Sequence, residues 1–269
     1  MNTLFVLLGW ALTALLVLAS LAIHEFAHVF AIKFMGAKVD KVGFFPLGML
    51  AKARRIETLH SWEKYVVYAA GPIANFAVAL WAFATSHISY TGVAWLDELA
   101  FYNIVLGVFN LTPALPLDGG RLALQFLGNR VGVLRAARLI KPLGRIIGCV
   151  FIFLGLIQVV LFPYNVTLFC AGVFIRKKNR KIEPEIQAHF HLALDGKNSE
   201  NRARTLKTKE IHIPPDTKIK HALERLAGDY FITYRIGEKK VTEAKLIEHI
   251  FTKGLSGTVE EIKSQNFIS

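Results

Sequence analysis

The feature that most restricts the fold of this sequence is an apolar run near its start, from Leu4 to Phe34. A run of this length can cross a lipid bilayer as a single helix. Close to its end, the run contains His24, Glu25 and His28. Ionisable side chains are costly inside a membrane, and they mark functional sites there. The run therefore predicts a membrane-spanning helix over residues 3–34 that carries a polar site.

His24 and His28 are four residues apart, so both imidazoles lie on one face of the predicted helix. This HExxH spacing lets two neutral imidazoles share one zinc ion, with Glu25 beside the metal as general base. Zinc held by two histidines and a carboxylate keeps one coordination position open and lowers the pKa of water there towards ~7. The spacing thus predicts a hydrolytic zinc site that still needs a third ligand.

Basic residues lie between and after the apolar runs of this chain. The 269 residues are 53% hydrophobic with a net charge of +12. Residues 36–64, residues 128–145 and the tail from Arg176 are rich in Lys and Arg, and the positive-inside rule places them in the cytoplasm. This pattern fits membrane topology better than contact with nucleic acid, and we expect no direct nucleic-acid partner.

The expected fold class is a polytopic α-helical membrane protein with a small C-terminal α+β domain. Its predicted spans, of which the third is broken, are about 3–34, 65–85, 99–127, 146–162 and 166–175. The N-terminus would then lie outside and the C-terminus in the cytoplasm. The sequence thus predicts an integral protein of a bacterial cytoplasmic membrane.

The third predicted span is interrupted by Pro113, Pro116 and the pair Gly119-Gly120. Irregular backbone at membrane depth is tolerated only where it lines a cavity or is buried in protein. Asp118 is the one acid within this span, and an intramembrane carboxylate needs a cation or another partner. Either a metal ion or an ion pair with Arg121 would supply it.

His24 and Asp118 are expected at a similar depth in the bilayer. His24 lies about ten residues before the first basic loop, and Asp118 lies about ten residues before Arg130. At a rise of ~1.5 Å per residue, both fall in the cytoplasmic half of the membrane. Asp118 is therefore the candidate third ligand beside His24 and His28.

Two further segments leave alternatives open. In the second span, Gly71-Pro72 and Asn75 predict a close helix contact, with Asn75 facing the interior either as packing or as site support. Residues 42–51 are apolar but broken by Gly and Pro, which predicts a short hairpin at the membrane surface. This hairpin either receives an extended substrate by strand addition or is only an interfacial loop.

The tail predicts a small module with strands at 211–213 and 230–236 and helices at 219–227 and 243–251. About 70 residues make a marginal core, so pairing with a second copy would stabilise it. The expected domains are a membrane domain at 1–180, a linker at 181–205 and a cytoplasmic domain at 206–269.

With these motifs in place, the chain resembles the site-2 protease family of intramembrane zinc metalloproteases. Three elements carry the resemblance: His24-Glu25-Phe-Ala-His28, Gly71-Pro72-Ile-Ala-Asn75, and the segment from Asn110 through Pro113 and Pro116 to Asp118-Gly119. The resemblance implies that His24, His28 and Asp118 bind one Zn²⁺, that Glu25 activates water and that Asn110 steadies the oxyanion or positions substrate. It also implies that Asn75, Pro116 and Gly119 support the site or the substrate.

The order of core and tail is similar to the branch of stage IV sporulation protein FB, whose C-terminal domain is CBS-like. That branch implies regulated intramembrane proteolysis of a membrane-associated sigma-factor precursor, restrained by membrane inhibitor proteins, in the mother-cell membrane around the forespore. It associates the CBS-like domain with ATP, but only one repeat is visible here, so nucleotide binding would require a homodimer. The branch has one more helix before HExxH, which leaves a further upstream helix open.

A metal-ion transporter or channel with a cytoplasmic regulatory domain is the main alternative function. An ion path would need acids or histidines at several depths, whereas this sequence places them at one level. A pseudoenzyme that binds partners through its tail is a second alternative. The presence of Glu25 together with three ligand candidates argues against it.

Overall fold

Helices make up most of the described chain in this computed structural model. The structure describes residues 3–36, 41–45, 48–52, 59–88, 93–161, 166–180, 207–226, 230–253 and 257–262. These residues fall into two compact units, Met1–Leu122 and Ala123–Ser269. The predicted linker at 181–205 lies outside the described residues, and the predicted domain boundaries stay predictions.

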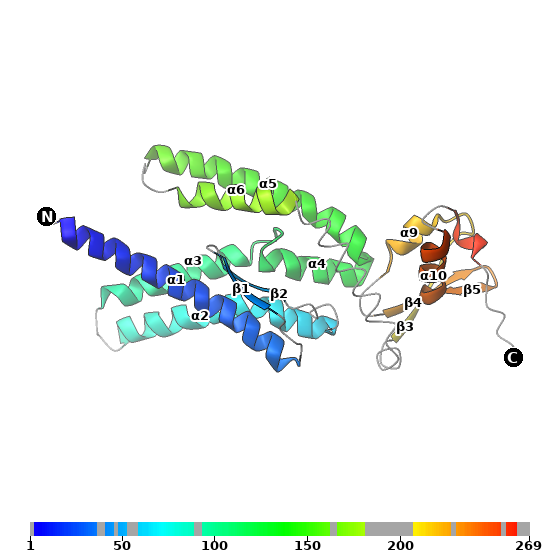
Figure 1. Cartoon of the computed structure of the whole chain (residues 1–269), viewed down its shortest axis with the longest axis horizontal. Coiled ribbons are helices and arrows are strands. Elements are labelled where there is room, and N and C mark those ends of the chain that lie inside the picture. Colours follow the sequence, from blue (N-terminus) through cyan, green and yellow to red (C-terminus); the bar gives the residue numbers. More distant parts are fainter. Residues whose placement is uncertain are drawn as a thin grey trace. The chain divides into compact units, whose positions relative to one another are not determined.

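The first unit is built on three helices, α1 (Thr3–Phe34), α2 (Ser61–Ile88) and α3 (Ala94–Asn110), which pack against one another (Figure 1). Large apolar side chains cover their outward faces, and Trp10, Phe30 and Leu80 are each about 70% exposed. So much exposed apolar surface is unfavourable in water but favourable in the hydrocarbon of a bilayer. These helices therefore fit a lipid environment.

Within the described residues, three helices are long and apolar enough to cross a membrane, over Val6–Phe34, Ser61–His87 and Val133–Leu161. The chain is therefore an integral membrane protein, as its sequence predicts. Helix α3 has only 17 residues and α6 (Thr167–Arg180) has 14, both shorter than a typical span. The count of five spans stays a prediction.

Residues 41–45 and 48–52 form a pair of antiparallel strands, as the predicted hairpin requires. Strand β1 (Lys41–Phe45) pairs antiparallel with β2 (Gly48–Lys52), so that Lys41 lies opposite Lys52. Strand β2 contacts α1. Within the described residues each strand has only one neighbour, which leaves a backbone edge unpaired. Whether this edge serves a substrate stays a prediction.

The break in the third predicted span is confirmed. Helix α3 ends at Asn110, and α4 (Asp118–Val131) begins after a turn that includes a cis peptide bond before Pro116. Gly119 is required at this turn, because a Cβ there would lie 2.0 Å from the carbonyl oxygen of Leu111. The turn thereby holds Asp118 at the first position of a helix that starts inside the unit.

In the second unit, α5 (Val133–Leu161) and α6 lie side by side (Figure 1). Glycines permit this close contact. A Cβ on Gly155 would lie 2.4 Å from the backbone nitrogen of Phe169, and one on Gly172 would lie 2.6 Å from that of Ile152. The pairing of the two helices is therefore fixed by backbone-to-backbone packing.

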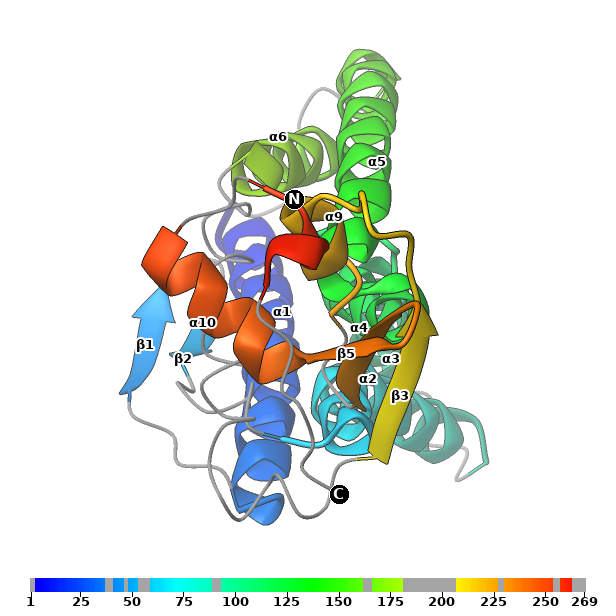
Figure 2. The same ribbon diagram turned by 90° about the vertical axis from the view of Figure 1, so that its right-hand side faces the viewer.

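The tail is a three-stranded sheet in the order β3 (Lys207–His212), β4 (Tyr230–Ile236), β5 (Lys239–Thr242), with β3 parallel to β4 and β5 antiparallel to it. Helices α9 (Ile219–Leu223) and α10 (Glu243–Lys253) and a 3-10 turn (Val259–Glu261) complete it (Figure 2). The α+β class of the tail is confirmed, whereas its CBS-like designation stays a prediction.

The predicted tail elements differ from the structure in three places. Strand β3 spans six residues from Lys207 rather than the three at 211–213, and β5 was not predicted. The first helix ends at Leu223, four residues earlier than expected, because the chain turns at Glu224 to meet the start of α5. There the Val133 N–H donates to the carbonyl oxygen of Leu226 at 3.3 Å.

Candidate metal centre

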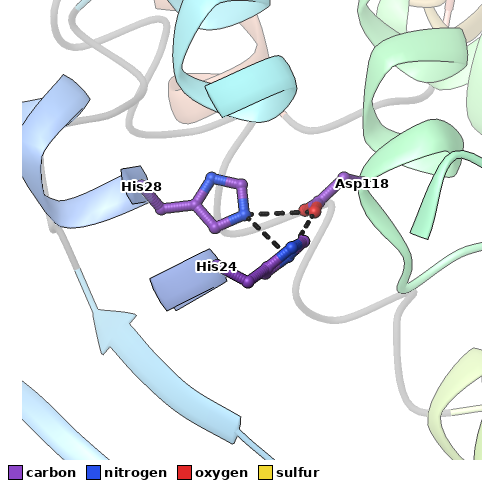
Figure 3. A group of neighbouring side chains, drawn as sticks. All are labelled: His24, His28 and Asp118. Atoms are coloured by element: carbon purple, nitrogen blue, oxygen red, sulfur yellow. Dashed lines mark hydrogen bonds and ion pairs between the residues drawn. The ribbon is translucent and has the colours of Figure 1, made fainter. Parts of the chain in front are cut away.

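His24, His28 and Asp118 meet at one point inside the first unit (Figure 3). The Nε2 atoms of the two histidines are 3.2 Å apart, and each lies 3.1 Å from Oδ2 of Asp118. The histidines come from one face of α1, and the carboxylate comes from the first residue of α4. The structure thus brings together two segments that are 90 residues apart in the chain.

Backbone and amide partners fix the tautomers of the two imidazoles. Nδ1 of His28 lies 2.7 Å from the carbonyl oxygen of Val67, which can only accept, so Nδ1 carries the proton. Nδ1 of His24 lies 2.5 Å from Oδ1 of Asn75. If Asn75 presents its oxygen there, both Nε2 atoms keep their lone pairs for the centre.

The orientation of Asn75 follows from its other partners. Its Nδ2 lies 3.3 Å from the carbonyl oxygen of Ser20 and 2.8 Å from Oδ1 of Asn103. Because a carbonyl can only accept, the NH₂ group of Asn75 faces Ser20 and its oxygen faces His24. The proton on Nδ1 of His24 is therefore set by the surrounding protein.

Asn103 and Ser20 anchor this arrangement. Nδ2 of Asn103 donates to the carbonyl oxygen of Leu99 at 2.9 Å and to Oγ of Ser20 at 2.8 Å. Oγ of Ser20 in turn donates to the carbonyl oxygen of Leu16 at 2.8 Å. Asn75 and Asn103 are fully buried. The result is a polar network, Ser20, Asn75 and Asn103, that joins α1, α2 and α3 behind the first histidine.

The geometry of the three ligand atoms fits a zinc ion. Tetrahedral zinc with bonds of about 2.0–2.1 Å separates its ligand atoms by about 3.3 Å. The three distances between the Nε2 and Oδ2 atoms lie within 0.2 Å of that value. With both Nδ1 atoms protonated, three lone-pair donors face one another, an arrangement that a cation stabilises.

Gly71 leaves space beside these ligand atoms. A Cβ at this position of α2 would lie 2.4 Å from Nε2 of His28 and 2.7 Å from Nε2 of His24. The next residue, Pro72, lies within the helix. The missing side chain of Gly71 therefore lets α2 approach both histidines, and the carbonyl of Val67 on the same helix meets Nδ1 of His28.

The remaining predicted site residues lie at different places. Glu25 is half-buried on α1, and the ionisable groups that act on it are His28, His24, Asp118 and Arg121. The amide of Asn110 turns back into its own helix, where Nδ2 donates to the carbonyl oxygen of Leu106 at 3.0 Å. Asn110 thus makes no hydrogen bond to the three ligand residues among the described contacts.

The alternative partner of Asp118 is not used in this structure. The guanidinium of Arg121 lies 5.9 Å from the ring centre of Tyr68, while the Asp118 carboxylate faces the imidazoles. Pro116 lies in the turn before α4, and Gly119 is the second residue of α4, directly after Asp118. Their role in supporting the site stays a prediction.

Three contributors were not predicted from the sequence: Ser20, Val67 and Asn103. Gly71 was predicted only to make a close helix contact, without its place beside the ligand atoms. The signal for Asn103 and Ser20 was present, because each is a polar residue inside an apolar helix and such residues face the protein interior. Val67 contributes only its backbone carbonyl, which no side-chain pattern reveals. The contribution of Gly71 depends on which helix lies opposite, and that is known only from the fold.

Comparisons with known proteins find a matching family and several similar proteins. The family described as Peptidase family M50 matches residues 12–101 and 92–155. A zinc metalloprotease of Methanocaldococcus jannaschii is 25% identical over 233 residues, covering 85% of this chain and 65% of the relative. Stage IV sporulation protein FB of Bacillus subtilis is 26% identical over 133 residues, covering 49% of this chain and 46% of the relative.

The chain is also similar to the solved structure of the site-2 protease from Methanocaldococcus jannaschii, with a TM-score of 0.53 and 25% sequence identity. The matched region covers 64% of this chain and 77% of the chain in that structure. This chain spans less than two thirds of the length of the curated relatives described above. Fold and site together define an integral membrane protein with a His₂Asp centre enclosed by its helices. The chain belongs to peptidase family M50, the family of the site-2 proteases.

Proposed function

We propose that this chain is an intramembrane zinc metalloprotease that hydrolyses a peptide bond in or near the membrane segment of a membrane-associated substrate. The observation that carries the proposal is the convergence of three ligand atoms at tetrahedral spacing. The helix that supplies both histidines also carries Glu25. Membership of family M50 and similarity to zinc metalloproteases support it.

His24, His28 and Asp118 would hold the zinc ion. Bound there, zinc would act as a Lewis acid that lowers the pKa of water and polarises a peptide carbonyl. Val67 and Asn75 keep the imidazole protons on Nδ1, so that Nε2 of each ring faces the centre. Such outer partners orient ligands and raise their basicity.

Glu25 is the proposed general base. It takes a proton from the attacking water and can return it to the leaving amine, a role that contributes typically about 10²–10⁴-fold to rate. It lies between His24 and His28 in the sequence of α1 and is not among the three ligand candidates. The charges of His28, His24 and Asp118 act on its carboxyl group, as expected for a base near the centre.

Asn110 is the proposed oxyanion donor, in a conformation different from the one described. Its amide now donates to the carbonyl of Leu106, and a rotation about χ1 and χ2 would redirect it towards the turn before Asp118. The carbonyl oxygen of a bound substrate would then replace the carbonyl of Leu106 as the acceptor. Catalytic hydrogen bonds often form fully only in the substrate complex. The β1–β2 hairpin would receive the unwound substrate through its unpaired backbone edge.

The finer function we propose is activation of a sporulation sigma-factor precursor in the mother-cell membrane around the forespore. Similarity to stage IV sporulation protein FB supports this branch. Within it, the C-terminus would be cytoplasmic, inhibitor proteins of the membrane would restrain cleavage, and the tail would form a homodimer that binds ATP. The basic residues in α6 support the cytoplasmic position.

The test compares Glu25→Gln with Asp118→Ala in the full chain, each co-expressed with a membrane-associated sigma-factor precursor. We expect Glu25→Gln to keep its zinc and to lose cleavage by about 10²-fold or more. Asp118→Ala should lose both the zinc and the cleavage activity. The matched control is Glu98→Gln, which changes an acid of α3 that accepts a hydrogen bond from Thr13. Cleavage by the Glu25→Gln protein would refute the general-base role.

The alternative of a metal-ion transporter is tested in sealed vesicles loaded with a zinc-sensitive dye. Within the described residues, one group of histidines and acids is arranged to hold a metal, which favours a fixed site over a path. The protease proposal predicts no zinc flux above that of empty vesicles. Flux that depends on Asp118 would favour transport instead.

A further inference from the structure

The second unit holds a group of basic side chains where α5 and α6 lie together. A Cβ on Gly148 would lie 3.2 Å from Cγ of Arg176, so the two helices leave little room between them at this level. Because glycines fix the pairing of the helices, the cations of α6 cannot move away from those of α5. Like charges held this close favour binding of an anion.

A cavity of about 350 Å³ lies among these residues, lined by Lys141, Arg145, Arg176, Asn179 and Arg180. Its lining contains no acid. Within the part of the chain that the structure describes, no carboxylate pairs with any of its three arginines, and Arg176 donates to Sγ of Cys149 at 2.7 Å. Arginine forks match the oxygen atoms of a phosphate group. The cavity therefore has the charge and the donors for a phosphate ligand.

Asn179 adds a second requirement. Its side chain is buried, and Nδ2 donates to the carbonyl oxygen of Lys141 at 2.8 Å, which fixes the direction of the amide. The opposite atom, Oδ1, is buried and has no hydrogen-bond partner among the described residues. A buried acceptor without a donor is costly. A ligand that carries a hydroxyl group as well as a phosphate would meet both needs.

The surroundings of the cavity are those of a lipid headgroup. From Arg145 to Leu161, helix α5 rises about 24 Å, which is close to the ~30 Å of a hydrocarbon core. A neighbouring cavity of about 390 Å³ shares Arg176 and Arg180 and is also lined by Lys177 and by the apolar residues Ile152 and Val173. A polar pocket that continues onto apolar residues can take a headgroup and the start of its acyl chain.

We infer that this cavity binds the phosphoglycerol headgroup of an anionic phospholipid. The phosphate lies among the arginines, the glycerol hydroxyl donates to Asn179, and the acyl chain follows Ile152 and Val173. This site belongs to the second unit, shares no residue with the metal centre and does not depend on the proposed function. A bound lipid would hold α5 and α6 together and neutralise their charges.

The test measures lipid bound to the full chain in neutral detergent by native mass spectrometry. Dioleoyl phosphatidylglycerol is compared with dioleoyl phosphatidylcholine, which has the same chains and no net charge. We expect selective retention of phosphatidylglycerol, weakened about 5-fold by Arg145→Gln and about 30-fold by Arg145→Gln/Arg180→Gln. Both arginines are exposed residues, so the variants should fold.

The control is Lys178→Gln/Lys209→Gln, which removes the same net charge from exposed positions outside both cavities. It should bind phosphatidylglycerol as the wild type does. Equal loss of phosphatidylglycerol binding in the two double variants would show that binding depends only on overall surface charge, and would overturn the proposed site. Equal binding of phosphatidylcholine, or full displacement of the lipid by millimolar inorganic phosphate, would also overturn it.

Discussion

Gly71 faces His28 across the contact of α2 with α1, with space for a hydrogen atom and no more. A methyl group on Gly71 would lie 2.4 Å from Nε2 of His28, the atom that points at Asp118. The first residue of the GPxxN element is therefore tied to the metal centre itself. The sequence alone had suggested only a close helix contact there.

Gly71→Ala is expected to displace at least one imidazole and to lower zinc content by about tenfold or more, since ligand placement governs affinity. Zinc per chain in the purified protein is the measurement. Gly9→Ala on α1 is the control, because a Cβ there meets nothing within 4 Å. Normal zinc content in Gly71→Ala would mean that α2 shifts freely and that the close contact is not needed.

Asn103→Ala should weaken zinc binding although Asn103 touches no ligand atom. The substitution removes the N–H group that donates to Ser20 and the oxygen that accepts a hydrogen bond from Asn75. The Asn75 amide, which orients His24, then loses its support. Loss of an outer partner typically costs about 10–100-fold in metal affinity. Competition with a zinc chelator gives the affinity, and the d–d spectrum of the cobalt-substituted protein reports ligand geometry.

A purely structural role for Asn103 would predict a lower melting temperature with an unchanged cobalt spectrum. Thr85→Val is the control, because it removes a hydrogen bond within α2 to the carbonyl of Trp81, away from the centre. It should change neither the spectrum nor the affinity.

Removal of the metal should destabilise the first unit. Without a cation, three lone-pair donors face each other at about 3 Å, and ligands that bind only the folded state stabilise it by mass action. A chelator should therefore lower the melting temperature of the wild-type protein. The same chelator should leave Asp118→Ala unchanged, and an equal drop in that variant would contradict a metal bound at this place.

Glu224 joins the tail to α5, and this contact should weaken in acid. Burial alone would raise the pKa of Glu224, but the hydrogen bond from Arg138 and the charges of Arg138, His221 and Arg135 lower it below 4.5. A carboxylate with a lowered pKa stabilises the fold above its unfolded pKa, and this stability is lost as pH falls through the folded pKa.

Hydrogen exchange at α9, measured from pH 7 down to pH 3, should therefore accelerate below about pH 4.5 beyond the intrinsic change. Glu224→Gln should remove this acid dependence and cost about 1 kcal/mol, since Arg138 is largely exposed. Glu260→Gln, an exposed acid of the 3-10 turn, is the control and should behave as the wild type.

The sequence predicted those parts of the structure that follow from residue spacing and from the cost of burying charge in a membrane. The HExxH spacing places two imidazoles on one helical face, and Asp118 beside two glycines in an apolar segment predicts a broken helix and a partner for the carboxylate. The sequence could not predict the rotamer of Asn110, because its amide donates to a carbonyl one turn earlier in the same helix. Strand β5 has only four residues, too few for an alternating pattern to stand out.

The hydrogen bonds among Ser20, Asn75 and Asn103 use no atom that a metal would take. Assembly of α1, α2 and α3 in the bilayer is therefore sufficient to orient His24, whether or not an ion has arrived. Insertion and metallation can then be separate events in the life of the protein. A newly inserted chain would then hold His24 in its ligand orientation before zinc binds.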